Sequence, residues 1–324
     1  TLGGGMEVGQ ITAVTEYSIL TMGYLLMAVS VLTTLPKARA CLARLTALLD
    51  TRPDVEDGAA SAAVAGPGRP AVEFDHVSFS YPGAEEPVLR DISFTLYPGQ
   101  TAAVIGSTGS GKSSLVNLIC RLYDVDEGNV KVGGLDVRAY DMEGLWNQVS
   151  VVLQKNTLFS GTILENLRWG NPDATDQECV EACKAACADE FIDRFPDGYH
   201  TRIERGGNNV SGGQKQRLCI ARALLKKPKI LIMDDSTSAV DTKTDALIRQ
   251  AMREEIPDTT KFIIAQRISS VQDADLILVM ENGRIDACGT HEELLNNGKL
   301  YESLYRKQQL EKELHEEGGA AHAE

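Results

Sequence analysis

Hydrophobic and polar positions follow two different patterns along this chain, one before and one after about residue 70. From Ile11 to Leu35 nearly every residue is apolar or small, and Glu16 is the single charged side chain. A helix of this length can cross the hydrocarbon core of a bilayer. Lys37, Arg39 and Arg44 follow directly. An excess of basic residues on one side of a span predicts that this side faces the cytoplasm.

A buried helix of a soluble protein is the alternative for this segment. Gly23 and the scattered Ser and Thr residues instead suit a helix packed against other membrane helices. We therefore predict a transmembrane helix with a cytoplasmic extension over residues 1–50. The following residues, 51–70, are rich in Ala, Gly and Pro without periodicity, which predicts a flexible linker.

From Ala71 onward the pattern becomes that of an α/β domain. The sequence AVEFDHVSFSY alternates as a strand does, and short apolar runs such as TAAVIG, KILIMDD and LILVMENG are separated by helical stretches. Buried runs that alternate with helices predict a mostly parallel central sheet over residues 71–305. A charged C-terminal helix and tail are expected over 306–324, the helix beginning at Leu300 and fraying after His315.

Composition narrows the classes of partner. The 324 residues carry a net charge of -14, which disfavours nucleic acid as a partner. None of the seven cysteines forms a CxxC pair, as expected of reduced cytosolic thiols. Cys179, Cys183 and Cys187 are spaced for one helix face, where core packing is favoured over metal binding. Because the chain begins at Thr1, it is expected to be part of a longer protein.

The strongest chemical signal follows the apolar run TAAVIG. Gly106, Gly109, Gly111, Lys112 and Ser113 match G-x-x-x-x-G-K-[ST] between a predicted strand and a predicted helix. Such a loop directs backbone N–H groups at phosphates, the lysine reaches the β- and γ-phosphates, and the hydroxyl binds Mg²⁺. The sequence therefore predicts a site for ATP and Mg²⁺. Its residues are Gly106, Ser107, Thr108, Gly109, Ser110, Gly111, Lys112, Ser113 and Ser114.

Two further motifs extend this prediction. The strand KILIMDD ends in Asp234, which is placed to hold Mg²⁺ as the second acidic element of such sites. The sequence VSGGQKQR precedes a helix that Ser211 is expected to cap, with Gly212 and Gly213 exposing its first N–H groups. This is a second phosphate-binding helix end without its own lysine. It could therefore close over ATP held by another subunit.

SGGQ between a phosphate loop and a strand ending in DD resembles the ABC ATPases, and the chain from about Gly4 to Tyr305 is similar to the C-terminal part of an ABC exporter half-transporter. The resemblance implies an α/β P-loop ABC ATPase domain. This domain has a mostly parallel central sheet, an antiparallel β subdomain and a helical subdomain, preceded by one transmembrane helix of an all-α membrane domain. It also implies two ATP sites in a head-to-tail dimer, in which Ser211, Gly212, Gly213 and Gln214 complete the partner's site.

The resemblance implies roles for three other segments. Tyr81 corresponds to the aromatic residue that stacks on adenine, although a strand-end core aromatic is the alternative. Gln154 corresponds to the glutamine that contacts Mg²⁺ and the attacking water and links to the membrane domain. Ser238–Asp241 corresponds to the loop that crosses to the partner's site.

The chain departs from the resembled family at two catalytic positions. Asp235 stands where the family usually has a glutamate that polarises the attacking water, and its carboxylate is one methylene shorter. Gln266 stands where the family has a histidine that contacts the γ-phosphate, and a glutamine is neutral. Both changes fall on one composite site, so slow hydrolysis there is expected. SGGQ is intact and should complete a partner's site.

The leading hypothesis is the degenerate-site subunit of a heterodimeric bacterial multidrug exporter. It would lie in the plasma membrane with its ATP-binding domain in the cytoplasm, pair with a second half-transporter, and act on drugs or other small amphipathic compounds. A homodimeric exporter that tolerates Asp235 and Gln266 is one alternative. A soluble ABC ATPase of DNA repair or translation is another, and the acidity and the Ile11–Leu35 segment disfavour it.

Overall fold

The computed structural model describes residues 7–61, 68–235 and 240–320, without the side chains of residues 242 and 311–320. The chain divides into two units, Thr1–Asp54 and Val55–Glu324. The first contains the helix α1, Val8–Leu49, which continues through Pro36. The expected membrane segment and its extension thus form one helix.

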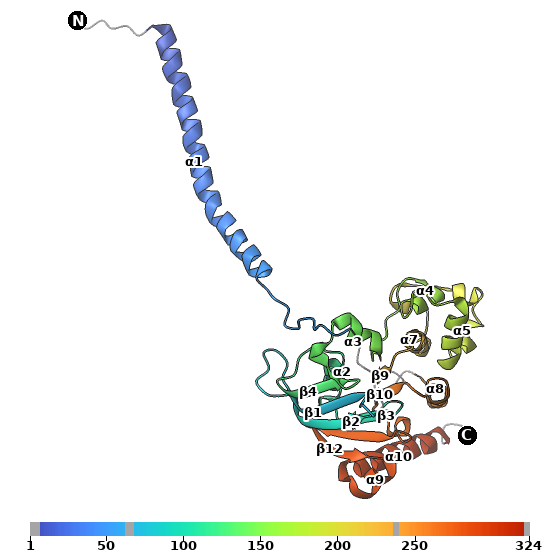
Figure 1. Ribbon diagram of the computed structural model, residues 1–324. Helices are drawn as coiled ribbons and strands as arrows, with labels where there is room; N and C mark the ends of the chain where they lie inside the picture. Colours follow the sequence, from blue (N-terminus) through green and yellow to red (C-terminus); the bar gives the residue numbers. More distant parts are fainter. Residues whose placement is uncertain (1–6, 62–67, 236–239, 321–324) are drawn as a thin grey trace. The chain divides into compact units, whose positions relative to one another are not determined.

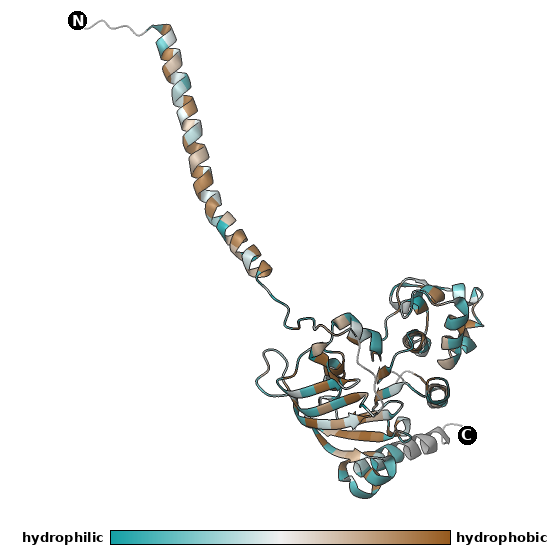
Figure 2. Ribbon diagram, in the orientation of Figure 1, coloured by the Kyte–Doolittle hydropathy of each residue, from teal (hydrophilic) through white to brown (hydrophobic). Residues whose placement is uncertain are grey.

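Helix α1 has the properties of a helix in an apolar environment. It is the one helix in the described part of the chain that is long and apolar enough to cross a membrane, and none of its residues is buried. Apolar residues recur along its whole length (Figure 2). The hydroxyls of Thr12, Thr15, Ser18 and Thr21 each donate to the carbonyl four residues earlier. These polar groups are therefore satisfied within the helix itself.

The described residues of the second unit form twelve strands in three sheets, several of which are labelled in Figure 1. The strands are β1 Val72–Phe79, β2 Leu89–Leu96, β3 Thr101–Gly106, β4 Glu127–Val132, β5 Leu135–Asp136, β6 Val149–Val152, β7 Gly161–Thr162, β8 Arg202–Ile203, β9 Ile230–Asp234, β10 Thr260–Ile264, β11 Leu276–Glu281 and β12 Arg284–Gly289. A six-stranded sheet has the order β12-β11-β3-β10-β9-β6. Only β12 pairs antiparallel within it. A mostly parallel central sheet is therefore confirmed.

Helices and short 3₁₀ turns cover this sheet. The helices are α2 Lys112–Ile119, α3 Met142–Gln148, α4 Ile163–Arg168, α5 Asp176–Ala185, α6 Asp189–Ile192, α7 Gly212–Leu225, α8 Thr242–Glu255, α9 His291–Asn297 and α10 Lys299–Ala320. The 3₁₀ turns are η1 Val137–Ala139, η2 Gly198–His200, η3 Arg205–Gly207 and η4 Ile268–Ser270. Helix α10 extends past His315, where the sequence predicted fraying.

Alternate residues of the central strands enter different cores. In β3, Ala102 and Val104 pack with α2 and the antiparallel sheet β2-β1-β4-β5. Ala103 and Ile105 face the opposite way and pack with α9 and α10. A third core joins β6 and β9 to α4, α5, α7 and α8. The period of two along a strand thus places β3 between two apolar layers, and the expected antiparallel and helical subdomains are confirmed.

Part of the predicted linker is docked on the second unit. The N–H of Gly58 donates to the Tyr140 carbonyl at 2.8 Å, and the N–H of Ala60 donates to the Ala139 carbonyl at 2.9 Å. The buried Arg121 guanidinium donates to the Glu56 carbonyl at 2.8 Å. The prediction of a flexible linker is therefore wrong for residues 56–61, because these backbone groups bond to residues more than sixty positions away in the sequence.

The three cysteines do not share one helix face. Cys179 and Cys183 are buried in the core around α5. Helix α5 ends at Ala185, and Cys187 has a left-handed φ of 53°. The predicted helical spacing was wrong for Cys187, because the helix ends before it.

Candidate functional site: a phosphate loop at the carboxyl ends of the central strands

The phosphate loop joins the end of β3 to the start of α2. Gly106 and Gly111 have φ values of 152° and 98°, which disfavour residues with a Cβ atom. A Cβ on Gly106 would also collide with the carbonyl oxygen of Met280, and one on Gly111 would lie 2.6 Å from Leu89 Cδ2. The close passage of the loop along β11 and β2 therefore requires glycine at both positions.

Lys112 is held over this loop. Its Nζ donates to the Gly106 carbonyl at 2.8 Å and to the Ser107 carbonyl at 2.7 Å. Burial lowers the pKa of Lys112, while Asp234 and Asp235 act in the opposite direction. The ammonium is thus a partly desolvated cation at the mouth of a glycine loop. This arrangement fits the terminal phosphates of a nucleotide.

Asp234 and Asp235 follow from the carboxyl end of β9. The Ser113 hydroxyl donates to Asp234 Oδ2 at 3.3 Å, which brings together the two side chains predicted to hold Mg²⁺. A hydroxyl and a carboxylate are the hard oxygen ligands that Mg²⁺ prefers. In the described part of the chain no group of three His, Cys, Asp or Glu residues forms a metal site, so the metal would depend on Ser113, Asp234, Gln154 and the nucleotide's own oxygens.

Two amide side chains donate hydrogen bonds to Asp235. Its Oδ2 accepts from Gln154 Nε2 at 3.2 Å and from Gln266 Nε2 at 2.9 Å. Asp235 has a left-handed φ of 45°, and its N–H donates to the Ile264 carbonyl at 2.9 Å. The three residues that the sequence marked as catalytic candidates therefore meet at one carboxylate oxygen.

Burial raises the pKa of both aspartates. Asp234 is affected mainly by burial, and hydrogen bonding from Ser113 and the charge of Lys112 lower its pKa. Asp235 is also affected mainly by burial, and the neighbouring Asp234 charge raises its pKa further. Two carboxylates in a partly desolvated site favour a cation that neutralises them.

These elements enclose a cavity of about 350 Å³. Its lining residues are Tyr81, Val88, Thr108, Gly109, Gly111, Lys112, Ser113, Ser114, Gln154, Asp234, Asp235, Ile264 and Gln266. The structure thus brings together most of the predicted site residues. The sequence reasoning missed Val88 and Ile264, two apolar wall residues. Val88 immediately precedes β2, and an apolar residue close to Tyr81 was the available signal.

Tyr81 packs against core aromatics and also lines the cavity. Its ring packs against the core aromatics Phe79 and Tyr123, with centroid distances of 4.9 and 5.1 Å. Its hydroxyl lies 3.0 Å from Ser114 Oγ and accepts from Asn117 Nδ2 at 3.1 Å. Tyr81 nevertheless lines the cavity, and its stacking on adenine stays a prediction.

The SGGQ segment lies elsewhere, at the start of α7. Ser211 accepts from the Gln214 N–H at 3.2 Å, and Gln214 Oε1 accepts from the Ser211 N–H at 2.9 Å, so the expected cap is confirmed. Ser211 and Gly212 are exposed. Among the residues that the structure describes, none of Ser211, Gly212, Gly213 and Gln214 lines the cavity of this chain.

The predicted crossing loop is described only in part. Ser238 and Ala239 lie outside the described residues. Val240 is buried, and Asp241 caps α8 by accepting from the Thr244 N–H at 3.0 Å. Asp241 therefore has a structural role in starting this helix.

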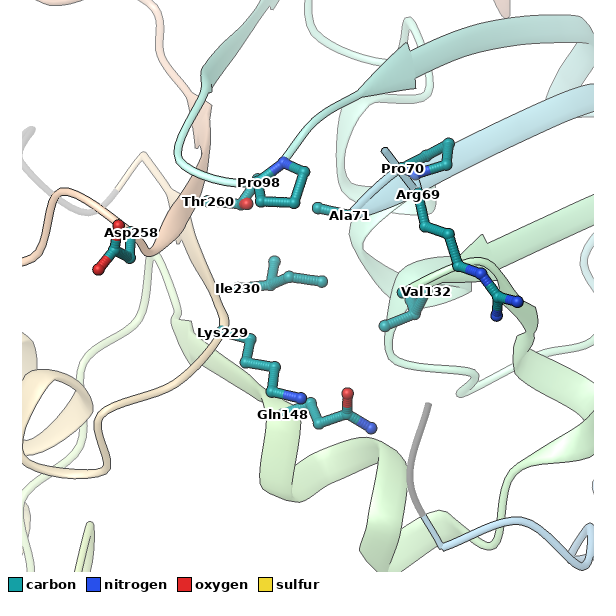
Figure 3. Close-up of a pocket in the computed structure, with 11 residues that line it drawn as sticks. Arg69, Pro70, Ala71, Pro98, Val132, Gln148, Lys229, Ile230, Asp258 and Thr260 are labelled. Atoms are coloured by element: carbon teal, nitrogen blue, oxygen red, sulfur yellow. The ribbon is translucent and has the colours of Figure 1, made fainter. Parts of the chain in front are cut away.

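A separate hollow of about 220 Å³ lies at the amino-terminal ends of β9 and β10, among Pro70, Pro98, Val132, Ile230 and Thr260 (Figure 3). Its surface is mainly apolar, and it is lined by neither the glycine loop nor the paired aspartates. In open parallel sheets ligands bind outside the carboxyl ends of the strands. The cavity beside Lys112 is therefore the candidate for the nucleotide site.

Comparison with known proteins agrees with this geometry. The family model for the ABC transporter matches residues 89–238, which run from the start of β2 past Asp235. Together with the central sheet and the phosphate loop, this match defines an ABC transporter ATP-binding domain.

Individual relatives extend the similarity. An uncharacterized ABC transporter ATP-binding protein of Mycobacterium tuberculosis is 44% identical over 319 residues, 95% of this chain and 53% of the relative. A Bacillus subtilis ATP-binding/permease protein whose name refers to multidrug export is 48% identical over 242 residues, 75% of this chain and 42% of the relative. A fatty acid ABC transporter ATP-binding/permease protein of Mycobacterium bovis is 46% identical over 236 residues, 72% of this chain and 37% of the relative.

A solved structure gives the same result. The structure of a bacterial Atm1-family ABC exporter with ATP bound matches with a TM-score of 0.80 and 35% identity, over 93% of this chain and 53% of that chain. The chain therefore spans about half the length of the relatives it matches.

Proposed function

We propose that this chain is the ATP-binding part of an ABC exporter subunit that moves small amphipathic compounds across the plasma membrane. The support is the combination of a membrane-compatible helix, α1, with an ABC ATP-binding domain on one chain. The names of similar proteins refer to multidrug export and to fatty acids, both of which fit an amphipathic cargo. The domain would lie in the cytoplasm, because basic residues follow the apolar segment in the sequence.

The site formed by this chain would bind Mg-ATP and hydrolyse it slowly. One observation carries this proposal: Asp235 Oδ2 is shared by the amides of Gln154 and Gln266. Both donors are neutral, so neither provides the charged donor or the proton acceptor of a histidine ring. The Asp235 carboxylate also ends one methylene short of a glutamate. A general base must lie within hydrogen-bond reach of the attacking water.

The SGGQ segment would serve the partner. Its exposed helix end is outside the cavity of this chain and points to use by a second subunit. The first N–H groups of α7 and the Ser211 hydroxyl form an anion site without a lysine. In a head-to-tail pair this anion site would face the ATP held by the other subunit's phosphate loop.

A groove beside Gln154 would connect the site to the membrane domain. It has a volume of about 340 Å³ and lies between β6 and α7. Leu153, Phe159 and Trp169 on its rim are 57%, 44% and 66% exposed. Phe159 stacks on Trp169 with a centroid distance of 4.6 Å. Cytoplasmic loops of the membrane domain that dock on these aromatics would contact the same segment whose Gln154 reaches Asp235.

The division of labour is tested by two substitutions in the assembled pair. Ser211→Ala removes a donor from the partner-led site and is expected to lower ATPase activity by about 10²-fold, the scale of losing one transition-state donor. Asp235→Ala alters the slow site and is expected to change total activity by less than about twofold, because that site contributes little turnover. ATPase rates of the reconstituted transporter measure both effects.

A matched control separates loss of function from loss of a helix cap. Thr290 caps α9 in the same capping-box arrangement as Ser211 caps α7. Thr290→Ala should therefore reproduce the capping loss, about 1 kcal/mol, without lowering ATPase activity. Equal losses from Ser211→Ala and Asp235→Ala would contradict the proposal and favour a homodimeric exporter.

A further inference from the structure

Gln308, a side chain of the last helix α10, forms two hydrogen bonds with the loop that carries Gln266. Gln308 of α10 donates from Nε2 to the Gln266 carbonyl at 2.8 Å, and its Oε1 accepts from the Ile268 N–H at 2.8 Å. The amide thus pairs with the backbone on both sides of Arg267. Two bonds from one planar group fix both the position and the orientation of a backbone segment.

The loop that Gln308 binds also carries the side chain that contacts Asp235. Gln266 lies after the end of β10 and before η4, outside both elements. Its side chain donates to Asp235 Oδ2 at 2.9 Å, while its carbonyl accepts from Gln308. Gln266 is therefore held at its backbone by Gln308 of α10 and at its side chain by Asp235.

Helix α10 is itself well anchored. Tyr301 is fully buried, and its hydroxyl lies 2.6 Å from His291 Nδ1 of α9. Gln308 follows Tyr301 by seven residues, which places both on one face of the helix. The face of α10 that carries the buried Tyr301 thus also carries the residue that contacts the loop.

We infer that Gln308 is a positioning residue for the nucleotide site. It acts through Gln266, whose amide it holds beside Asp235 and the phosphate end of the cavity, and it lies outside that cavity among the described residues. This inference rests on the proposed function of the cavity as an Mg-ATP site. The C-terminal helix would thereby set the turnover of ATP at a site to which it contributes no contact with nucleotide.

A double-mutant cycle in the full-length transporter tests this inference. In the full-length protein purified without a partner, where each site is this chain's own slow site, Gln308→Ala and Gln266→Ala are each expected to lower kcat for ATP about fivefold, a loss within the range of coupled neighbours. KM and the Kd for Mg-ATP should stay within about twofold because Lys112 and Tyr81 are untouched. In the Gln266→Ala background, Gln308→Ala should have no further effect. Single-turnover hydrolysis of radiolabelled ATP measures even a slow site.

The controls isolate the contact. Gln309→Ala changes the neighbouring glutamine of the same helix, for which the structure shows no such loop contact, and should leave kcat unchanged. Gln308→Glu keeps the acceptor for the Ile268 N–H but loses the donor to Gln266, and should give an intermediate kcat even if Gln308→Ala does not fold. Independent, multiplicative effects in the double variant would overturn the inference, as would an unchanged kcat in Gln308→Ala. If Mg-ATP does not bind at all, the proposed function fails instead.

Discussion

At the scale of single residues, the adjacent carboxylates of Asp234 and Asp235 make nucleotide binding sensitive to acid. Burial raises the pKa of each above its ordinary value. Mg²⁺ requires ionised carboxylates, so the Kd for Mg-ATP is expected to rise as pH falls through these raised pKa values, before ordinary aspartates near about 3.9 are protonated. Fluorescence titration with an ATP analogue from neutral pH down to about 3.9, the ordinary value for aspartate, measures this change.

The control for this pH dependence is Asp234→Asn, whose remaining response reports the titration of Asp235 and of the nucleotide phosphates. The stability of the nucleotide-free protein changes with pH in the opposite direction. Between the ordinary and the raised pKa values the folded state binds more protons than the unfolded state. The contribution of these groups to the free energy of unfolding therefore increases as pH falls through that window. Equal pH dependence in wild type and Asp234→Asn would exclude Asp234 as the metal ligand.

At the scale of elements, the docked segment Glu56–Ser61 reverses the usual effect of a helical glycine. Alanine in place of an exposed helical glycine stabilises a protein by about 1 kcal/mol. Gly144 is buried in α3, and a Cβ there would collide with the backbone of Ser61. Gly144→Ala is therefore expected to destabilise the protein by about 1–3 kcal/mol, the usual cost of overpacking. Urea denaturation measures this change in the free energy of unfolding.

The control is Asn147→Ala, at an exposed position of the same helix, which should leave the free energy of unfolding nearly unchanged. A stabilised Gly144→Ala variant would show that the segment Glu56–Ser61 is not docked.

The segment Glu56–Ser61 also shows which contacts the sequence could not predict. Strand β3 and the phosphate loop were predictable because their signals are local: an apolar run, fixed glycines and a following helix. The docking of Gly58 on Tyr140 was not predictable, because it depends on backbone groups with no side-chain signature. The contact of Gln308 with Gln266 joins residues 42 positions apart in the sequence, and a glutamine in a charged helix carries no pattern. Position within the tertiary structure, rather than residue type, makes these groups functional.

At the scale of the whole molecule, the chain combines an intact SGGQ segment with altered catalytic positions, Asp235 and Gln266. This combination predicts how the chain behaves without a partner. Two copies would form two identical sites, each with an intact SGGQ end and the Asp235–Gln266 pair. Both sites would be slow, so the full-length protein purified alone should bind Mg-ATP tightly and turn it over slowly. Rapid ATP hydrolysis by the wild-type chain alone would instead support a homodimeric exporter.

Restoring the two catalytic side chains tests the cause of that slow rate. Asp235→Glu extends the carboxylate by one methylene, and Gln266→His introduces a ring that donates and accepts protons. Together they should raise kcat by about 10²-fold, the lower end of what general-base catalysis contributes, with little change in the Kd for Mg-ATP because Lys112 and Ser113 are unaltered. Adding Lys112→Ala to the double variant should abolish the gain. An unchanged kcat in the double variant would place the rate-limiting step outside this site.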